Sequence, residues 1–174
     1  MSKMSLTTKE NDRKSLIYMA DLSHTGQVVS ANVHPLGIGV IAAYALKEHS
    51  TSVEIELFKY PEDLAQALEN RPPDIMGFAN YSWNLNIAYD FAQRIKLKHP
   101  EVVIVFGGPN YGLTEEELAD FWAKHPAIDF YLVREAEVAF AQLISTLREV
   151  NFEVEAVKRM DSPPANAHYF ENGK

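Results

Sequence analysis

Apolar residues occur along this chain in short runs that alternate with longer amphipathic stretches. Five runs have the length and composition of β-strands, at positions 15–20, 53–57, 74–79, 102–106 and 128–133. The stretches after these runs repeat their apolar residues every three or four positions, which predicts helices that begin near positions 37, 61, 84, 114 and 135. We therefore expect strand and helix to alternate from residue 15 to about residue 148.

This alternation predicts an α/β fold with a parallel sheet and helices on both faces. The run Val53–Leu57 alternates apolar and acidic residues, so this strand belongs at an edge of the sheet. The first, third and fourth runs are apolar on both faces, as central parallel strands are. We therefore predict a doubly wound, five-stranded parallel sheet with the flavodoxin-like strand order 2-1-3-4-5.

The predicted domain comprises residues 14–150. Residues 1–13 are polar, and we expect a disordered lead-in there. Residues 151–174 contain a proline pair and end in a strand-like segment before Asn172-Gly173, a typical hairpin turn whose return strand is missing. We interpret this stretch as a linker into a missing C-terminal domain.

The composition mainly excludes several kinds of functional site and partner. The 174 residues include no cysteine, which excludes disulfides, a thiolate nucleophile and a cysteine-ligated zinc or iron–sulfur cluster within the chain. A net charge of −8 is unfavourable for binding nucleic acid. No apolar run approaches the ~20 residues of a membrane span, and no histidine pair has metal-ligand spacing. We expect a cytoplasmic domain without nucleic-acid or membrane partners and without a metal site.

In an open α/β sheet, ligands bind beyond the carboxyl ends of the strands, where the strand order reverses. The loops at that edge are rich in aromatic, amide and glycine residues, which suit a large flat ligand with polar edges. The candidate cofactor-binding residues there are His34, Asn80, Tyr81, Ser82, Trp83, Asn84, Gly107, Gly108, Pro109 and Asn110. The alternative is that Tyr81 and Trp83 cover the core and that the two glycines only form a turn.

Four segments, in their order along the chain, resemble the N-terminal cobalamin-binding domain of radical S-adenosylmethionine enzymes. They are Pro35–Gly37 at a helix start, Asp74–Asn80, Val102–Asn110 with its Gly-Gly-Pro turn, and Ile128–Glu137 with its Glu-Ala-Glu step. The resemblance implies a flavodoxin-like fold that binds cobalamin at the carboxyl edge of the sheet, in a crevice of corrin size. It adds Pro35, Gly37 and Glu135 to the candidate cofactor-binding residues.

The resemblance also implies that catalysis belongs to another domain. In that family a following barrel binds S-adenosylmethionine and ligates an iron–sulfur cluster through cysteines, and this barrel would be the partner of the present domain. The chain alone is then not catalytic, and it holds the corrin for methyl transfer or radical chemistry. Gly108→Val is expected to abolish cobalamin retention without changing the circular dichroism, because the new side chain would occupy ligand space.

Two positions depart from the patterns of cobalamin proteins. Arg134 stands where the radical enzymes usually have the first glycine of Gly-Glu-Gly/Ala-Glu. His24 lies one place later than the cobalt ligand in the Asp-x-His-x-x-Gly motif of other cobalamin enzymes. We therefore assign no cobalt ligand to this chain.

Three other functions fit parts of the sequence. Ser23–Gly26 is similar to the phosphate loop of flavodoxins, and Trp83 and Tyr111 could sandwich a flavin, as in an electron carrier. However, Pro35 interrupts the helix that should directly follow such a loop. A receiver-type signalling domain fits poorly, because its paired acids, strand-ending aspartate and lysine are replaced by Asp21 alone, Asn80 and Arg134. The third alternative is a ligand-free docking domain.

Overall fold

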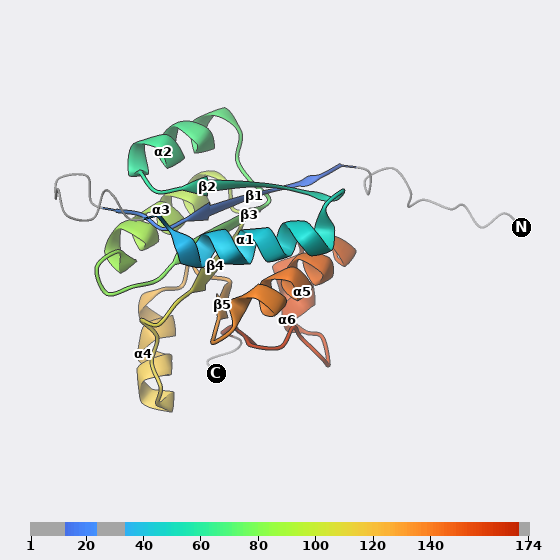
Figure 1. The fold of residues 1–174 in the computed structure, drawn as a ribbon. Helices are drawn as coiled ribbons and strands as arrows, with labels where there is room; N and C mark the ends of the chain where they lie inside the picture. The colour runs from blue at the N-terminus through green and yellow to red at the C-terminus, as the bar shows by residue number, and fades with distance from the viewer. Residues whose placement is uncertain (1–12, 24–33, 171–174) are drawn as a thin grey trace, which may run out of the picture.

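The computed structural model describes residues 13–23 and 34–170. These residues form a layer of mostly parallel strands between two layers of helices (Figure 1). Most of the predicted lead-in, together with His24 and the Asn172-Gly173 turn, lies outside the described residues.

The sheet contains six strands in the order β2-β1-β3-β4-β5-β6. Five of them are parallel: β1 (Ser15–Ala20), β2 (Val53–Phe58), β3 (Ile75–Ala79), β4 (Val103–Gly107) and β5 (Phe130–Leu132). The sequence predicts five strands, but the structure contains a sixth. This strand, β6 (Ala167–His168), pairs antiparallel with β5. A strand of two residues is too short to produce a periodic pattern that the sequence could reveal.

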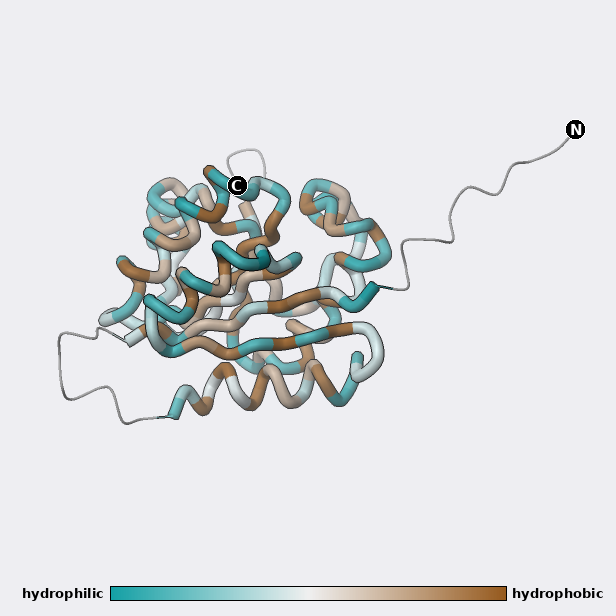
Figure 2. The backbone as a smooth tube through the Cα atoms, turned by 90° about the horizontal axis from the view of Figure 1, so that it is seen from above, coloured by the Kyte–Doolittle hydropathy of each residue, from teal (hydrophilic) through white to brown (hydrophobic). Residues whose placement is uncertain are grey.

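Helices cover both faces of the sheet, as predicted. On one face lie α1 (Leu36–His49) and α5 (Ala136–Glu149), and on the other lie α2 (Pro61–Asn70), α3 (Leu85–Lys98) and α4 (Glu115–Lys124) (Figure 1). Figure 2 shows the hydrophobic strands running between these helices. Because strand side chains alternate, the sheet separates two hydrophobic cores, one under α1 and α5 and one under α2, α3 and α4.

The start of α4 confirms a capping box that the sequence predicts. The Thr114 hydroxyl accepts a hydrogen bond from the Glu117 N–H at 3.2 Å, and the Glu117 carboxylate accepts one from the Thr114 N–H at 3.1 Å. The two bonds satisfy N–H groups that the first helical turn would otherwise leave unpaired.

Residues 154–170, which the sequence suggests as part of a linker, pack onto the domain. The helix α6 (Val154–Lys158) buries Val157 in the core under α1 and α5. The Tyr169 hydroxyl donates a hydrogen bond to the Lys158 carbonyl at 3.0 Å. The role of this stretch as a connection to a further domain stays a prediction. None of the helices in the described residues is long and apolar enough to cross a membrane.

Candidate cofactor-binding site

A cleft with a volume of about 400 Å³ opens at the carboxyl ends of the parallel strands. It lies between the sheet and the first turns of α1 and α5, which cover the same face (Figure 1). Its walls are mainly apolar and include Met19, Ile38, Ile41, Leu132 and Phe140. This is the place where doubly wound folds bind ligands.

Small residues at neighbouring positions create this space. Along the face under α1 and α5, β3 begins with Ile75 but continues with Gly77 and Ala79. The neighbouring strand β4 ends with Gly107, which pairs with Ala79 and also lines the cleft. Since protein interiors are otherwise close-packed, the absent side chains leave a void beneath the two helices.

The structure brings together part of the predicted site. The predicted residues that line the cleft are Gly37, Tyr81, Gly107, Gly108 and Glu135. Pro35 precedes α1 directly. The predicted residues outside the lining are the exposed His34, Ser82, Trp83 and Pro109, the half-buried Pro35 and Asn110, and the buried Asn80 and Asn84. The sequence analysis missed several residues that line the cleft, notably Asp21, Gly77, Arg134 and Glu137.

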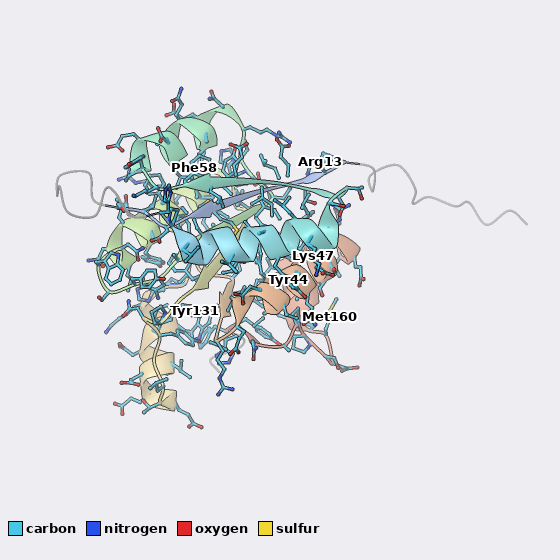
Figure 3. All side chains as sticks on the ribbon, in the orientation of Figure 1. Arg13, Tyr44, Lys47, Phe58, Tyr131 and Met160 are labelled. Atoms are coloured by element: carbon cyan, nitrogen blue, oxygen red, sulfur yellow. The ribbon has the colours of Figure 1, made fainter. Side chains whose placement is uncertain are left out.

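Asn80 ties the loop after β3 to the loop after β4. Its side-chain amide donates hydrogen bonds to the Asn110 carbonyl at 2.7 Å and to the Tyr131 hydroxyl at 3.0 Å. The Tyr131 hydroxyl in turn donates to the Gly108 carbonyl at 2.9 Å. Tyr131 projects from β5 toward α4, and its burial raises the pKa of the phenol far above the usual value (Figure 3). Asn80 and Tyr131 therefore fix the shape of the cleft rim rather than face a ligand.

Replacing Tyr131 with Phe is expected to lower the free energy of unfolding by about 1–3 kcal/mol, because a partly buried carbonyl and an amide each lose a partner. Urea denaturation measures the change. Tyr89→Phe is the matched control, since the Tyr89 hydroxyl accepts one long hydrogen bond of 3.5 Å from the Ala127 N–H. Equal losses in the two variants would contradict the role given to Tyr131.

Asn84 has a similar structural role on the other side of the cleft. Its side-chain oxygen accepts a hydrogen bond from the Tyr81 N–H at 2.8 Å, and its amide donates to the Asp21 carboxylate at 3.0 Å. Asp21 lines the cleft. Burial raises the pKa of Asp21, and the hydrogen bond from Asn84 opposes part of that change. Asp21 is thus a carboxyl group whose environment disfavours its charge.

Replacing Asp21 with Asn is expected to reduce the pH dependence of stability. Because the pKa of Asp21 is higher in the folded than in the unfolded state, the folded state binds more protons between these two values. The free energy of unfolding of the wild type therefore falls as the pH rises through this window, which starts near the ordinary carboxyl pKa of about 4. Urea unfolding across the window should show a smaller fall in Asp21→Asn. A constant difference between wild type and variant would contradict this assignment.

Two stacked aromatic rings stand at the cleft. The ring centroids of Tyr81 and Trp83 are 4.5 Å apart with planes 6° from parallel. Tyr81 lines the cleft, whereas Trp83 is 62% exposed and therefore does not cover the core. The Tyr111 ring instead stacks on the Tyr131 ring in the core under α4, with their centroids 3.9 Å apart. The predicted flavin sandwich between Trp83 and Tyr111 is wrong, because Tyr111 does not line the cleft and belongs to the opposite face of the sheet.

Arg134, between β5 and α5, has a backbone conformation that is rare for its residue type. Its φ of 59° lies in the left-handed region, which costs a residue with a Cβ about 1–2 kcal/mol. Glycine adopts this conformation freely, which explains its use at this position in the family pattern. Arg134 lines the cleft together with Glu135 and Glu137, and it is exposed to solvent.

A doubly wound α/β fold with a cleft at the carboxyl ends of its parallel strands defines a cofactor-binding domain of the Rossmann-like class. The chain belongs to the B12 binding domain family, whose pattern matches residues 24–144, more than half of the chain. This finding confirms the resemblance seen in the sequence.

The chain is also similar to parts of longer proteins. It is 28% identical over 117 residues to the cobalamin-dependent radical SAM methyltransferase TokK of Streptomyces tokunonensis, a match that covers 64% of this chain and 17% of that protein. It is 28% identical over 115 residues to the 2-(S-pantetheinyl)-carbapenam-3-carboxylate methyltransferase of Streptantibioticus cattleyicolor, covering 63% and 16% respectively. The matches thus span about a sixth of the length of each of these two relatives.

The chain shares its fold with solved structures. The cobalamin-dependent S-adenosylmethionine radical enzyme OxsB, with aqua-cobalamin and S-adenosylmethionine bound, matches with a TM-score of 0.65 and 14% identity. The match covers 92% of this chain and 21% of that chain. At this identity the likeness concerns the fold.

Proposed function

We propose that this chain binds cobalamin at the cleft and holds it for a reaction that another domain carries out. The observation that carries the proposal is the set of small residues Gly77, Ala79 and Gly107, which keeps an apolar cleft open at the ligand-binding edge of a B12 binding domain. A Cβ at Gly77 would meet the Met19 side chain at an ordinary contact distance of 3.6 Å, so the backbone there does not require glycine. The absence of a side chain is better explained by a ligand that uses the space.

The size of the cleft indicates which part of cobalamin enters it. A cleft of about 400 Å³ has room for a flat part of cobalamin, and the expected crevice of corrin size stays a prediction. The cleft is narrow because α1 and α5 contact each other over the sheet. A narrow apolar space suits a flat heterocycle such as the benzimidazole of the nucleotide tail. The exposed apolar side chains of Leu36, Val40 and Trp83, which lie in or next to the lining segments, would then hold the corrin.

Polar groups at the mouth suit the amide side chains of the corrin. The carboxylates of Asp21, Glu135 and Glu137 line the cleft and accept hydrogen bonds from amide N–H groups. Gly37, at the first turn of α1, lets a ligand approach the backbone closely. The lining residues therefore suit part of cobalamin in polarity and hydrogen-bonding character.

The chain supplies binding and orientation in this proposal. Bound cobalamin contributes a cobalt centre that carries an alkyl group. The described residues contain no group of three or more histidine, aspartate or glutamate side chains placed to bind a metal ion. The partner is a barrel domain that binds S-adenosylmethionine and an iron–sulfur cluster, and the names of the two relatives favour methyl transfer as the reaction of the whole protein.

A binding experiment tests the proposal. The purified protein is mixed separately with hydroxocobalamin and with flavin mononucleotide, desalted, and examined by visible absorption. Retained corrin bands and quenched tryptophan fluorescence are the expected result. Retained flavin bands would instead support the electron carrier. Retention of neither compound would favour a docking domain without a ligand.

A further inference from the structure

We propose that the guanidinium of Arg134 binds the phosphodiester of the cobalamin nucleotide tail at the mouth of the cleft. This inference rests on the proposed function and names the residue that recognises the ligand's anionic group. It concerns a side chain that the candidate cofactor-binding residues predicted from the sequence do not include.

Among the described residues that line the cleft, Arg134 is the single cation. Three carboxylates line the same cleft, from Asp21, Glu135 and Glu137. These negative charges would repel an anion that enters the cleft. Among the described lining residues, only the positive charge of Arg134 would offset this repulsion. Arginine is the side chain best suited to the task, because its planar fork makes two parallel hydrogen bonds to a phosphate.

The guanidinium of Arg134 is also available. The other five arginines each have a hydrogen-bond or ion-pair partner: Arg13, Arg71, Arg94, Arg148 and Arg159. Among the described residues, Arg134 has none, even though Glu135 and Glu137 are close to it in the sequence. A charged donor group that lines a cleft without a partner is free to bind a ligand of opposite charge.

The backbone of Arg134 adds a second, independent argument. Within residues 13–23 and 34–170, four residues other than glycine have a positive φ, namely Arg134, Asn151, Phe152 and Asn166. Two of these are asparagine, which tolerates this conformation. Arg134 alone among the four lines the cleft. A residue that is unfavourable for the backbone at a ligand-binding position is expected where its side chain contributes to binding.

The chemistry of the ligand places the phosphodiester near Arg134. The phosphodiester lies between the nucleotide base and the corrin in the covalent structure of cobalamin. If the base occupies the cleft and the corrin lies over its mouth, the phosphodiester crosses the rim. Arg134 is on that rim, at the turn from β5 into α5.

The test measures dissociation constants of three ligands for the wild type and for Arg134→Asn. The ligands are cobalamin, cobinamide phosphate, which has a phosphate but no benzimidazole, and cobinamide, which has neither. Asparagine removes the charge and tolerates the left-handed backbone. Tryptophan quenching and absorption titrations give the constants at low and high salt.

We expect Arg134→Asn to raise the dissociation constants of cobalamin and cobinamide phosphate at least tenfold. The dissociation constant of cobinamide should change less than twofold. The salt dependence of cobalamin binding should shrink in parallel. Arg94→Asn, at an exposed helix position, is the matched control and should change none of the constants. Arg134→Gly should lower the affinity for cobalamin. It should also raise the urea midpoint of unfolding, since glycine relieves the backbone strain.

An equal loss of affinity for all three ligands would overturn the inference. Arg134 would then contact the corrin or stabilise the fold, and it would not bind the phosphate group. Unchanged cobalamin binding would overturn it as well. If the wild type binds cobalamin but Arg134→Asn shows no selective loss, the inference fails and the proposed function stands. If the wild type binds none of the three ligands, both fail.

Discussion

Gly77→Leu is expected to lower the affinity for cobalamin more than a hundredfold, equivalent to about 2.7 kcal/mol of binding free energy, while the protein stays folded. The first atom of the new side chain would make ordinary contacts, at 3.6 Å from Met19 Cγ and 3.7 Å from the Tyr18 carbonyl oxygen. The remaining atoms would extend into the cleft beneath α1 and α5 and take the space proposed for the nucleotide tail. Absorption titration measures the affinity, and urea unfolding measures the stability.

Gly39→Leu is the matched control for this prediction. A Cβ at Gly39 would meet no atom within 4 Å, and Gly39 does not line the cleft. The control should therefore bind cobalamin like the wild type. Full affinity in Gly77→Leu would mean that no part of the cofactor enters beneath the two helices, and the proposed binding mode would be wrong.

Gly108→Val is expected to destabilise the protein by about 3 kcal/mol, the upper end of the cost of a strained backbone position. Gly108 has a φ of 135°, which residues with a Cβ rarely adopt. A Cβ there would lie 2.5 Å from the Asn80 carbonyl oxygen and 3.0 Å from the Asn80 nitrogen. The loss would appear as a lower urea midpoint. We therefore expect the circular dichroism of the variant to change at urea concentrations where the wild type is still folded, in place of the unaltered signal expected from the sequence.

Gly107→Ala provides the comparison for Gly108→Val. A Cβ at Gly107 would lie 3.4 Å from the Leu132 carbonyl oxygen, and Gly107 is not among the residues with a positive φ. It should therefore cost much less stability, although its methyl group would enter the cleft. Equal destabilisation by the two substitutions would show that crowding at the turn, and not the backbone conformation of Gly108, is decisive.

The sequence predicts the layers of the fold well, because burial on one or both faces of a strand is a local property. The acidic positions of Val53–Leu57 correctly place β2 at an edge. The cleft was harder to foresee. Glycine within a strand indicates several structures, and only the register of β3 against β4 places Gly77, Ala79 and Gly107 on one face.

The two asparagines illustrate a second limit. Asn80 and Asn84 have the side-chain chemistry and the position of ligand-binding residues, yet both are buried and bonded within the protein. Their partners Tyr131 and Asp21 lie 51 and 63 residues away in the chain. Such pairings depend on the packing of distant segments, so residue type alone does not separate a scaffold amide from a ligand-binding one.

The short antiparallel strand β6 has a consequence for how the molecule behaves among its own copies. β6 pairs with Tyr131 and Leu132, and the Asn166 carbonyl accepts a hydrogen bond from the Val133 N–H at 2.9 Å. A chain shortened to end before Asn166 would leave the backbone groups on the outer edge of β5 without partners, while the pairing of β5 with β4 would remain. An open strand edge is a template for strands of neighbouring molecules. The shortened protein would therefore tend to self-associate, whereas the glutamates of β2 discourage such pairing at the opposite edge.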